Sequence, residues 1–214
     1  MRQRKDFKRQ ENIKSDRLII IAAEGRCTEK IYFDEMKLSL MHPRVHVEIL
    51  VRDDNNSSPE NVYEQIKDFE RMYDVEEDDQ LWVVVDTDRW PEKMLSSVAQ
   101  YCSQSPSLNF CVSNPCFELW LLLHLEDISA YSEETKVQLA ENRKVNSQDT
   151  WLKHRMKELT GHYHESDYDA SSLIKTIDSA IERAIELDIN PTDRWPQSVG
   201  TRVYLLAKSI MSFD

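Results

Sequence analysis

The sequence of 214 residues lacks several features that define common protein classes. No apolar run is long enough to cross a bilayer, and the first residues show no signal-peptide pattern. The four cysteines have no CxxC spacing, which disfavours a zinc site and predicts reduced thiols. We therefore expect a cytoplasmic protein that does not contact a membrane.

Positive charge is also scarce, since 27 basic residues stand against 39 acidic ones and the net charge is −12. A protein that simply coats nucleic acid should be basic, so the charge argues against that class. Residues 53–92 contain 14 acidic and only three basic residues. Residues 1–17 differ, with seven basic and three acidic residues, and we expect a mobile arm there that contacts phosphates or only aids solubility.

The sequence nevertheless contains enough apolar material for a core, because 40% of its residues are hydrophobic. Short apolar runs predict strands at residues 18–23, 45–51, 81–85 and 108–112. Helical patterns lie between and after them, at residues 29–41, 59–73, 91–104 and 116–125. Thr28 is the expected N-cap of the first helix, and Pro115 the expected first residue of the last, after a cap at Ser113 or Asn114.

This alternation predicts an α/β fold with a four-stranded, mainly parallel sheet flanked by helices. After residue 125 the pattern changes. Residues 126–150 and 160–170 are polar and are predicted to be irregular, and helices are expected at about 150–159, 171–187 and 200–212. The predicted organisation is thus a basic arm (1–17), an α/β core (18–125) and a helical C-terminal extension packed on the core (126–214).

Acidic residues follow the predicted strands at the points where the strands end. Glu24 follows the first strand, Asp86 and Asp88 follow the third, and Glu118 lies in the first turn of the helix after the fourth. The carboxyl ends of parallel strands lie along one edge of the sheet, so these four carboxylates should gather. Clustered carboxylates repel one another and need a cation, and oxygen ligands select Mg²⁺ or Mn²⁺.

The spacing of these residues supports a metal site, although each residue also has an ordinary explanation. Asp86 and Asp88 point to the same side if the strand stays extended, but aspartates are also common in turns. Gly25, one of only three glycines, lets the backbone turn sharply towards a ligand, and any strand-to-helix turn could use it in the same way. Glu29 is interpreted as a complement to the helix dipole, with a ligand role as the alternative.

Several other side chains could be functional or structural. Arg26 and Arg89 could neutralise a phosphate or pair with the acidic residues. Asn114 could bind phosphate or metal, or cap the following helix. His124 is interpreted as a core or capping histidine, and Trp120 as part of the core. His162 and His164 alternate in a predicted loop and could bind a metal ion, but the sequence offers no third ligand nearby.

The strand followed by Glu-Gly, the strand followed by Asp-x-Asp and the four-strand alternation resemble the Toprim fold of topoisomerases, primases and OLD-type nucleases. More specifically, four segments resemble the RloB-like family of bacterial and archaeal proteins: EGRCTEKIYF, VVVDTDRW, SNPCFELWLLLH and GTRVYLLAKSI. The resemblance covers nearly the whole chain. It implies a nuclease effector of an antiphage system, encoded beside an ABC-type ATPase.

The resemblance also implies roles for the acidic residues. It makes Glu24 a metal ligand or general acid/base, and Asp86 and Asp88 metal ligands. Glu118 corresponds to the acid of the family's asparagine-proline-x-phenylalanine-glutamate stretch. Thr87 is a departure, since relatives often carry a basic residue between the two aspartates.

We therefore expect a Mg²⁺- or Mn²⁺-dependent phosphodiester hydrolase that acts on RNA, such as tRNA, or on DNA, with an ABC-type ATPase as partner. One alternative is a haloacid-dehalogenase-type phosphatase with Asp86 as nucleophile, although no convincing lysine and acidic pair follows. Another is a non-catalytic subunit whose acids bind a metal only structurally. The sequence leaves open whether the chain forms a homo-oligomer.

Overall fold

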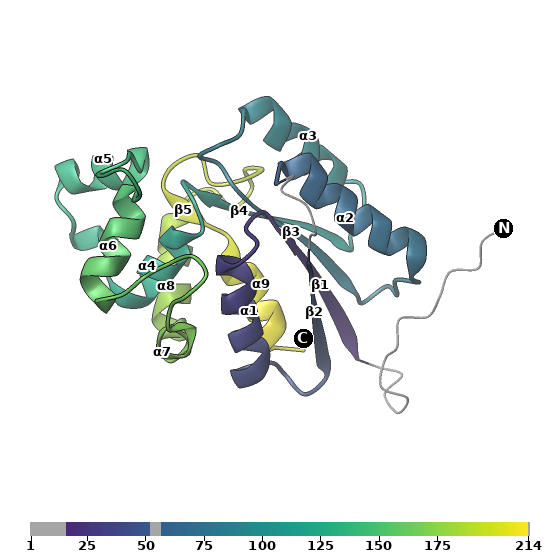
Figure 1. Cartoon of the computed structure of the whole chain (residues 1–214). Helices are drawn as coiled ribbons and strands as arrows, with labels where there is room; N and C mark the ends of the chain where they lie inside the picture. Colours follow the sequence, from purple (N-terminus) through teal and green to yellow (C-terminus); the bar gives the residue numbers. More distant parts are fainter. Residues whose placement is uncertain (1–15, 52–56, 214) are drawn as a thin grey trace.

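The computed structural model describes residues 16–51 and 57–213. Residues 1–15 of the predicted basic arm and residues 53–56 of the predicted loop before the second helix lie outside the described residues. Among the described residues, five strands form one sheet in the order β2-β1-β3-β4-β5 (Figure 1). The strands are β1 (Arg17–Ala23), β2 (Val45–Leu50), β3 (Gln80–Asp86), β4 (Leu108–Asn114) and β5 (Gly200–Thr201).

The predicted α/β class with a mainly parallel sheet is confirmed. Strands β1 to β4 pair in parallel, and each corresponds to a strand predicted from sequence. The expectation of four strands was wrong by one, since β5 pairs antiparallel with β4 at the sheet edge. Two residues carry no period-two pattern, so sequence could not distinguish β5 from the helix that follows it.

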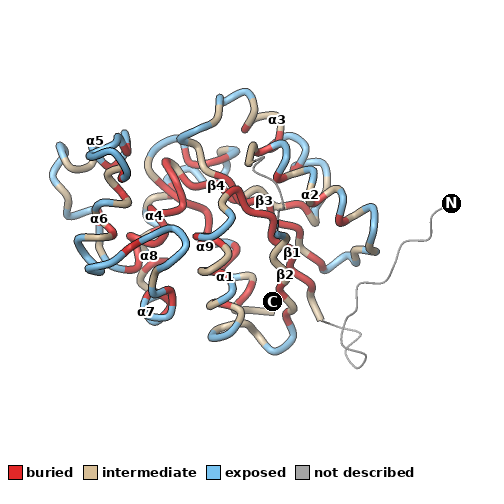
Figure 2. Tube along the Cα trace, viewed as in Figure 1, coloured by how far each residue is buried: buried red, intermediate tan, exposed pale blue. Residues whose placement is uncertain are grey.

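Helices cover both faces of the sheet. Helices α2 (Pro59–Met72) and α3 (Glu92–Cys102) pack on one face, and α1 (Thr28–Ser39), α4 (Glu118–Leu125) and α9 (Val203–Met211) on the other. Side chains of β1 alternate accordingly: Ile19 and Ile21 belong to the α1 side, and Leu18 and Ile20 to the α2 side. Burial is therefore highest in the central strands and in α4, where Trp120 is buried as predicted (Figure 2).

The C-terminal extension shares the hydrophobic cluster of the α1 side. Besides α9, its helices are η1 (Ile128–Ala130), α5 (Glu133–Glu141), α6 (Trp151–Thr160), α7 (Ala170–Ile174) and α8 (Ile177–Leu187). Apolar side chains of α6 and α8 pack in one cluster with α4, so the cluster crosses the predicted boundary at residue 125, and that boundary stays a prediction. None of the described helices is long and apolar enough to cross a membrane.

Three helix predictions were wrong in detail for local reasons. Residues 126–150 are not wholly irregular, because Ser132 caps α5 by accepting a hydrogen bond from the Thr135 N–H (3.2 Å). The predicted helix 171–187 is broken at Thr176, whose hydroxyl donates to the carbonyl oxygen of Leu173 (2.9 Å). The predicted helix 200–212 starts only at Val203, because the preceding residues join the sheet.

Two predicted helix starts were also displaced. Cys27, not Thr28, is the N-cap of α1, and the Thr28 hydroxyl instead donates to the carbonyl oxygen of Glu165 (3.2 Å). Helix α4 begins at Glu118, so Pro115 precedes the helix and is not its first residue. Both starts lie at the carboxyl ends of strands, where tertiary contacts determine the local geometry.

Candidate active site

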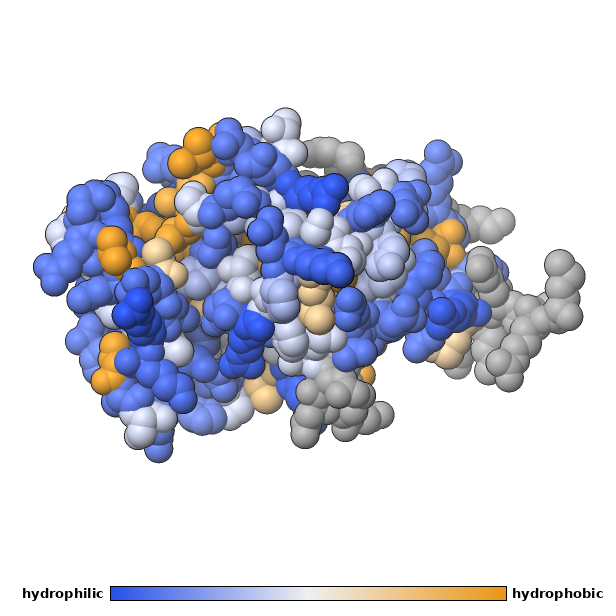
Figure 3. Space-filling model, turned by 90° about the horizontal axis from the view of Figure 1, so that it is seen from above, coloured by the Kyte–Doolittle hydropathy of each residue, from blue (hydrophilic) through white to orange (hydrophobic). Residues whose placement is uncertain are grey.

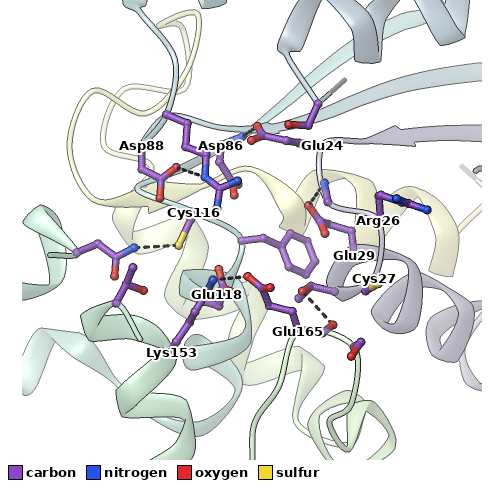
Figure 4. A pocket seen from close by; sticks show the side chains of 18 of the residues that line it. Glu24, Arg26, Cys27, Glu29, Asp86, Asp88, Cys116, Glu118, Lys153 and Glu165 are labelled. Atoms are coloured by element: carbon purple, nitrogen blue, oxygen red, sulfur yellow. Dashed lines mark hydrogen bonds and ion pairs between the residues drawn. The ribbon is translucent and has the colours of Figure 1, made fainter. Parts of the chain in front are cut away.

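A cavity of about 480 Å³ opens at the carboxyl ends of β1 and β3, beside the first turns of α1 and α4 (Figure 4). Among the described residues, six carboxylates line it: Glu24, Glu29, Asp86, Asp88, Glu118 and Glu165. The structure thus brings together the four acids predicted from sequence and adds two more.

The end of β3 aims both aspartates into this cavity. Asp86 is the last residue of β3 and lies two positions after Val84, which faces the α1 side, so Asp86 faces the same side. The backbone N–H groups of Thr87 and Asp88 both donate to the carbonyl oxygen of Pro115 (3.1 Å each). This contact fixes the turn after β3 against the segment that leads into α4.

Glu24 directly follows β1, and its side chain contacts the end of the neighbouring strand β3. Its side chain is buried, and its Oε2 accepts a hydrogen bond from the Asp86 backbone N–H (3.1 Å). Burial raises the pKa of Glu24, and the Asp86 N–H opposes that shift by stabilising the ionised form. Glu24 is therefore held rigidly beside Asp86.

Glu29 is a member of the site that the sequence interpretation underrated. It lies in the first turn of α1, is 3% exposed, and accepts a hydrogen bond from the Gly25 N–H (2.9 Å). Burial, followed by the charges of Glu118 and Glu24, raises its pKa to about 7. A helix-dipole role does not require such burial, so Glu29 belongs with the acidic cluster.

Gly25 is required by this contact, which gives a first prediction. A Cβ atom on Gly25 would lie 1.9 Å from Glu29 Oε2, so Gly25→Ala must displace the Glu29 carboxylate. The displaced group is the end of a flexible side chain, so we expect the free energy of unfolding to change by less than about 1 kcal/mol. Affinity for Mn²⁺, measured by calorimetry, should nevertheless fall several-fold.

Gly161→Ala provides the contrasting control. Gly161 has a positive φ of 74° and open space around it, so alanine there should cost about 1 kcal/mol of stability and leave Mn²⁺ affinity unchanged. Unchanged Mn²⁺ affinity in Gly25→Ala would contradict the placement of Glu29 in the site.

Glu118 and the two aspartates complete the set of acids predicted from sequence. Glu118, the first residue of α4, is buried and accepts a hydrogen bond from the Tyr163 hydroxyl (3.2 Å). Burial, and then the charges of Glu29 and Glu24, raise the pKa of Asp86 well above its usual range. Burial also raises the pKa of Asp88, and the nearby Arg89 opposes the shift.

The donor set of this cavity fits a hard divalent cation. Carboxylate oxygens are the ligands that Mg²⁺ and Mn²⁺ prefer, and the raised pKa values reflect burial and repulsion that a bound cation would offset. Within the described residues, no three acidic, histidine or cysteine side chains already stand close enough together to enclose an ion. Binding would therefore require some of these carboxylates, such as Asp88, to rotate towards a common point.

Basic side chains at the cavity come from the core and from the extension. Arg26 and Arg89 line the cavity, and Arg89 Nε lies 4.0 Å from Asp88 Oδ1. Their contact with a phosphate stays a prediction. Lys153 of α6 also lines it and forms an ion pair with Glu165. Sequence analysis missed Lys153 because only the folding of the extension over the core brings it near the acids.

Asn114 does not line the cavity. Its Oδ1 accepts a hydrogen bond from the Thr87 hydroxyl (3.0 Å), and its Nδ2 donates to the carbonyl oxygen of Pro196 (3.1 Å). The amide is thus engaged within the protein, and its predicted contact with substrate stays a prediction. The same hydrogen bond holds the Thr87 hydroxyl at Asn114, and Thr87 does not line the cavity.

The histidines divide between core and surface. His124 is buried between the Tyr32 hydroxyl (2.9 Å) and the carbonyl oxygen of Leu173 (2.7 Å), which agrees with the core interpretation. His162 pairs with Asp167 on the surface (3.1 Å), whereas His164 lines the cavity.

A mainly parallel sheet with acidic residues at the carboxyl ends of β1 and β3 defines a Toprim-like α/β protein. The family described as RloB-like protein matches residues 19–210, which is most of the chain, so the chain belongs to the RloB-like family. Comparison with curated proteins gives no match, and comparison with solved structures gives none either.

Proposed function

We propose that the protein is a Mg²⁺-dependent phosphodiester hydrolase that cleaves RNA, such as tRNA, or DNA. The observation that carries the proposal is the gathering of Glu24, Asp86, Asp88 and Glu118 in one cavity at the ends of the central strands. Membership of the RloB-like family supports it, because the sequence segments that carry the family resemblance contain all four residues.

In this proposal the acidic residues have distinct roles. Glu24, Asp86 and Asp88 would hold one or two Mg²⁺ or Mn²⁺ ions. When bound, such an ion neutralises negative charge on the phosphate and lowers the pKa of water. Burial raises the pKa of Glu24, which suits it to act as a general acid or base.

Two side chains on the other walls would orient the substrate. Glu118 is fixed by the Tyr163 hydroxyl, so its carboxylate keeps one orientation. Lys153 could stabilise negative charge on the phosphate once its ammonium group leaves Glu165. Lys153 would then hold the phosphate at the boundary between the core and the extension.

We further propose that the protein is an effector of an antiphage system and acts with an ABC-type ATPase. The net charge of −12 and the acidic segment 53–92 repel a polyanion, so free substrate should bind weakly and with a steep salt dependence. The partner would capture substrate or restrain the enzyme until a trigger. We therefore expect little cleavage by the isolated chain at physiological salt.

The direct test is a cleavage assay on plasmid, single-stranded DNA and total tRNA, with Mg²⁺ or Mn²⁺, with and without the partner ATPase. We expect cleavage that EDTA stops and that Glu24→Gln removes. Glu60→Gln, at an exposed glutamate in the first turn of α2, is the matched control and should keep full activity.

Three results would change this account. Cleavage that survives Glu24→Gln would place the chemistry elsewhere. Efficient, Glu24-dependent cleavage by the free chain at physiological salt would refute the partner requirement and support the hydrolase. Assembly with the ATPase without hydrolysis under any condition would favour the non-catalytic subunit.

The phosphatase alternative gains one observation, because Lys153 supplies a cation at the cavity that the sequence did not reveal. It would require Asp86 to attack a phosphate monoester as nucleophile. Burial, and then the neighbouring carboxylates, however, raise the pKa of Asp86, which disfavours a free nucleophilic carboxylate. Hydrolysis of p-nitrophenyl phosphate that Asp86→Asn abolishes, without any nuclease activity, would favour this alternative.

A further inference from the structure

A second cavity, of about 730 Å³, lies on the other side of α6 from the acidic cavity. Four residues of α6 that recur at helical spacing line it: Trp151, His154, Arg155 and Glu158. Lys153 and the N-cap residue Thr150 instead line the acidic cavity. Helix α6 is thus a wall shared by both cavities, and α5 closes the second one from outside (Figure 1).

The chain around the start of α6 is basic in an otherwise acidic protein. Residues 143–157 contain five basic residues and one acidic residue: Arg143, Lys144, Lys153, Arg155, Lys157 and Asp149. Four of the five line a cavity: Arg143, Lys144 and Arg155 the second one, and Lys153 the acidic one. Arg155 is paired with Glu126 and Glu158.

Lys144 is exposed and lines the second cavity, and no carboxylate in the described part of the chain lies within ion-pair distance of it. Arg143 pairs with Glu141, but both side chains are largely exposed, and such surface pairs contribute little. Lys153 lies on the opposite wall, in the acidic cavity. Of these three residues, only Lys144 therefore lacks a carboxylate partner among the described residues.

Two aromatic rings complete the second cavity. Tyr131 and Trp151 both line it, in an edge-to-face arrangement with ring centroids 6.2 Å apart. The Trp151 indole N–H donates to Gln138 Oε1 (3.2 Å), which fixes the orientation of the ring. Half-buried aromatic rings beside basic residues are the combination with which proteins stack the bases of single-stranded nucleic acid.

The backbone between the cavities is built by specific contacts. Asn142 adopts a left-handed conformation (φ 41°), and its Oδ1 accepts a hydrogen bond from the Leu152 N–H (3.0 Å). Its Nδ2 donates to the sulfur of Cys116 in the acidic cavity (3.3 Å). The backbone N–H of Trp151 donates to the carbonyl oxygen of Arg143 (2.9 Å). These contacts tie the start of α6 to the wall of the acidic cavity.

We propose that the second cavity binds a nucleobase of single-stranded nucleic acid, stacked on Trp151, while the backbone of the strand crosses Lys144 and Lys153 towards the acidic cavity. This inference rests on the proposed hydrolase function and narrows its substrate to strands with unpaired bases beside the scissile phosphate. The volume is in the range of ligand cavities. The described part of the face drawn in Figure 3 is mostly hydrophilic, with hydrophobic patches between the hydrophilic residues.

The test is fluorescence anisotropy with short single-stranded oligonucleotides of RNA and of DNA, at low salt and in EDTA, so that binding is measured without cleavage. Trp151→Ala should weaken binding about ten-fold or more, and Trp151→Phe should retain most of it. Lys144→Ala should weaken binding to all sequences and reduce the slope of log K against log salt by about one. Melting temperatures verify that each variant is folded.

Two control variants match these changes. Tyr101→Ala removes an exposed aromatic ring on α3, and Lys175→Ala removes an exposed lysine between α7 and α8. Neither residue lines the two cavities, so neither should change binding. A strand with an abasic backbone should bind wild type and Trp151→Ala equally, because it has no base to stack.

The outcomes separate this inference from the proposed function. Absence of single-strand binding by the wild type, or equal binding by folded Trp151→Ala, would overturn the base-binding cavity even if the enzyme cleaves. Loss of ATPase association in Trp151→Ala, with oligonucleotide binding intact, would make the cavity a protein interface and also overturn it. Trp151-dependent binding without cleavage under any condition would support the cavity and refute the hydrolase.

Discussion

Asp86→Asn is expected to abolish metal-dependent cleavage and, at the same time, to stabilise the metal-free protein. The activity should fall about a thousand-fold or more, because a ligand of the catalytic cation contributes several kcal/mol to the transition state. The stability should rise because burial and the charges of Glu29 and Glu24 disfavour the ionised Asp86. A neutral amide removes that repulsion, which is worth about 1 kcal/mol or more. Melting in EDTA and cleavage in Mg²⁺ measure the two effects.

Asp79→Asn is the matched control for the combination of lost activity and raised stability expected of Asp86→Asn. Asp79 is buried at the far end of the sheet, where its carboxylate accepts hydrogen bonds from the N–H groups of Leu18 (3.0 Å) and Glu76 (2.8 Å). Replacing it should lower the melting temperature and leave cation binding intact. If Asp86→Asn destabilised the metal-free protein as Asp79→Asn does, Asp86 would be a structural hydrogen-bond acceptor and not a functional acid.

The metal-free protein should lose stability as the pH rises from about 5 to about 8. The folded protein holds the Glu29 proton up to a pKa of about 7, whereas the unfolded chain releases it near 4.5. The folded state therefore binds more protons between these values, and the free energy of unfolding falls as pH increases through this window. For Glu29 alone the loss is on the order of 3 kcal/mol at most, and Glu24, Asp86 and Asp88 act in the same direction.

Melting temperatures in EDTA across this pH range measure the effect. Glu29→Gln should reduce the dependence, since it removes one of the buried groups whose pKa is raised. Added Mn²⁺ should weaken or reverse the trend, because the cation binds ionised carboxylates and its affinity rises with pH. A melting temperature in EDTA that stays level or increases from about pH 5 to about pH 8 would contradict the assignment of raised pKa values to this cluster.

Much of the sheet and of its acidic edge could be predicted from the sequence. Runs of β-branched residues such as Val83–Val85 are typical of buried parallel strands. The chain direction then places Asp86 and Asp88 at the carboxyl end of the strand. Glu24 and Glu118 followed from the same rule, because each lies just after a strand or at the start of the next helix. These inferences depend on local periodicity, which the sequence carries directly.

The residues that were missed depend on tertiary contacts. Glu29 lies in the first turn of α1, where an acidic residue is favoured by the helix dipole alone. Only its contact with the Gly25 N–H shows that it belongs to the cluster. Lys153 and Asn142 reach the cavity because the extension folds over the core, and no local pattern encodes that path. Strand β5 has only two residues, which is too short for any periodic signal.

The central claim is that the gathered carboxylates share a divalent cation, and calorimetric titration with Mn²⁺ tests it most directly. The wild-type protein should bind Mn²⁺, and the double substitution of Asp86→Asn with Asp88→Asn should weaken that binding at least about ten-fold, which is about 1.4 kcal/mol. Equal Mn²⁺ affinity in the wild-type protein and the double variant would contradict the account.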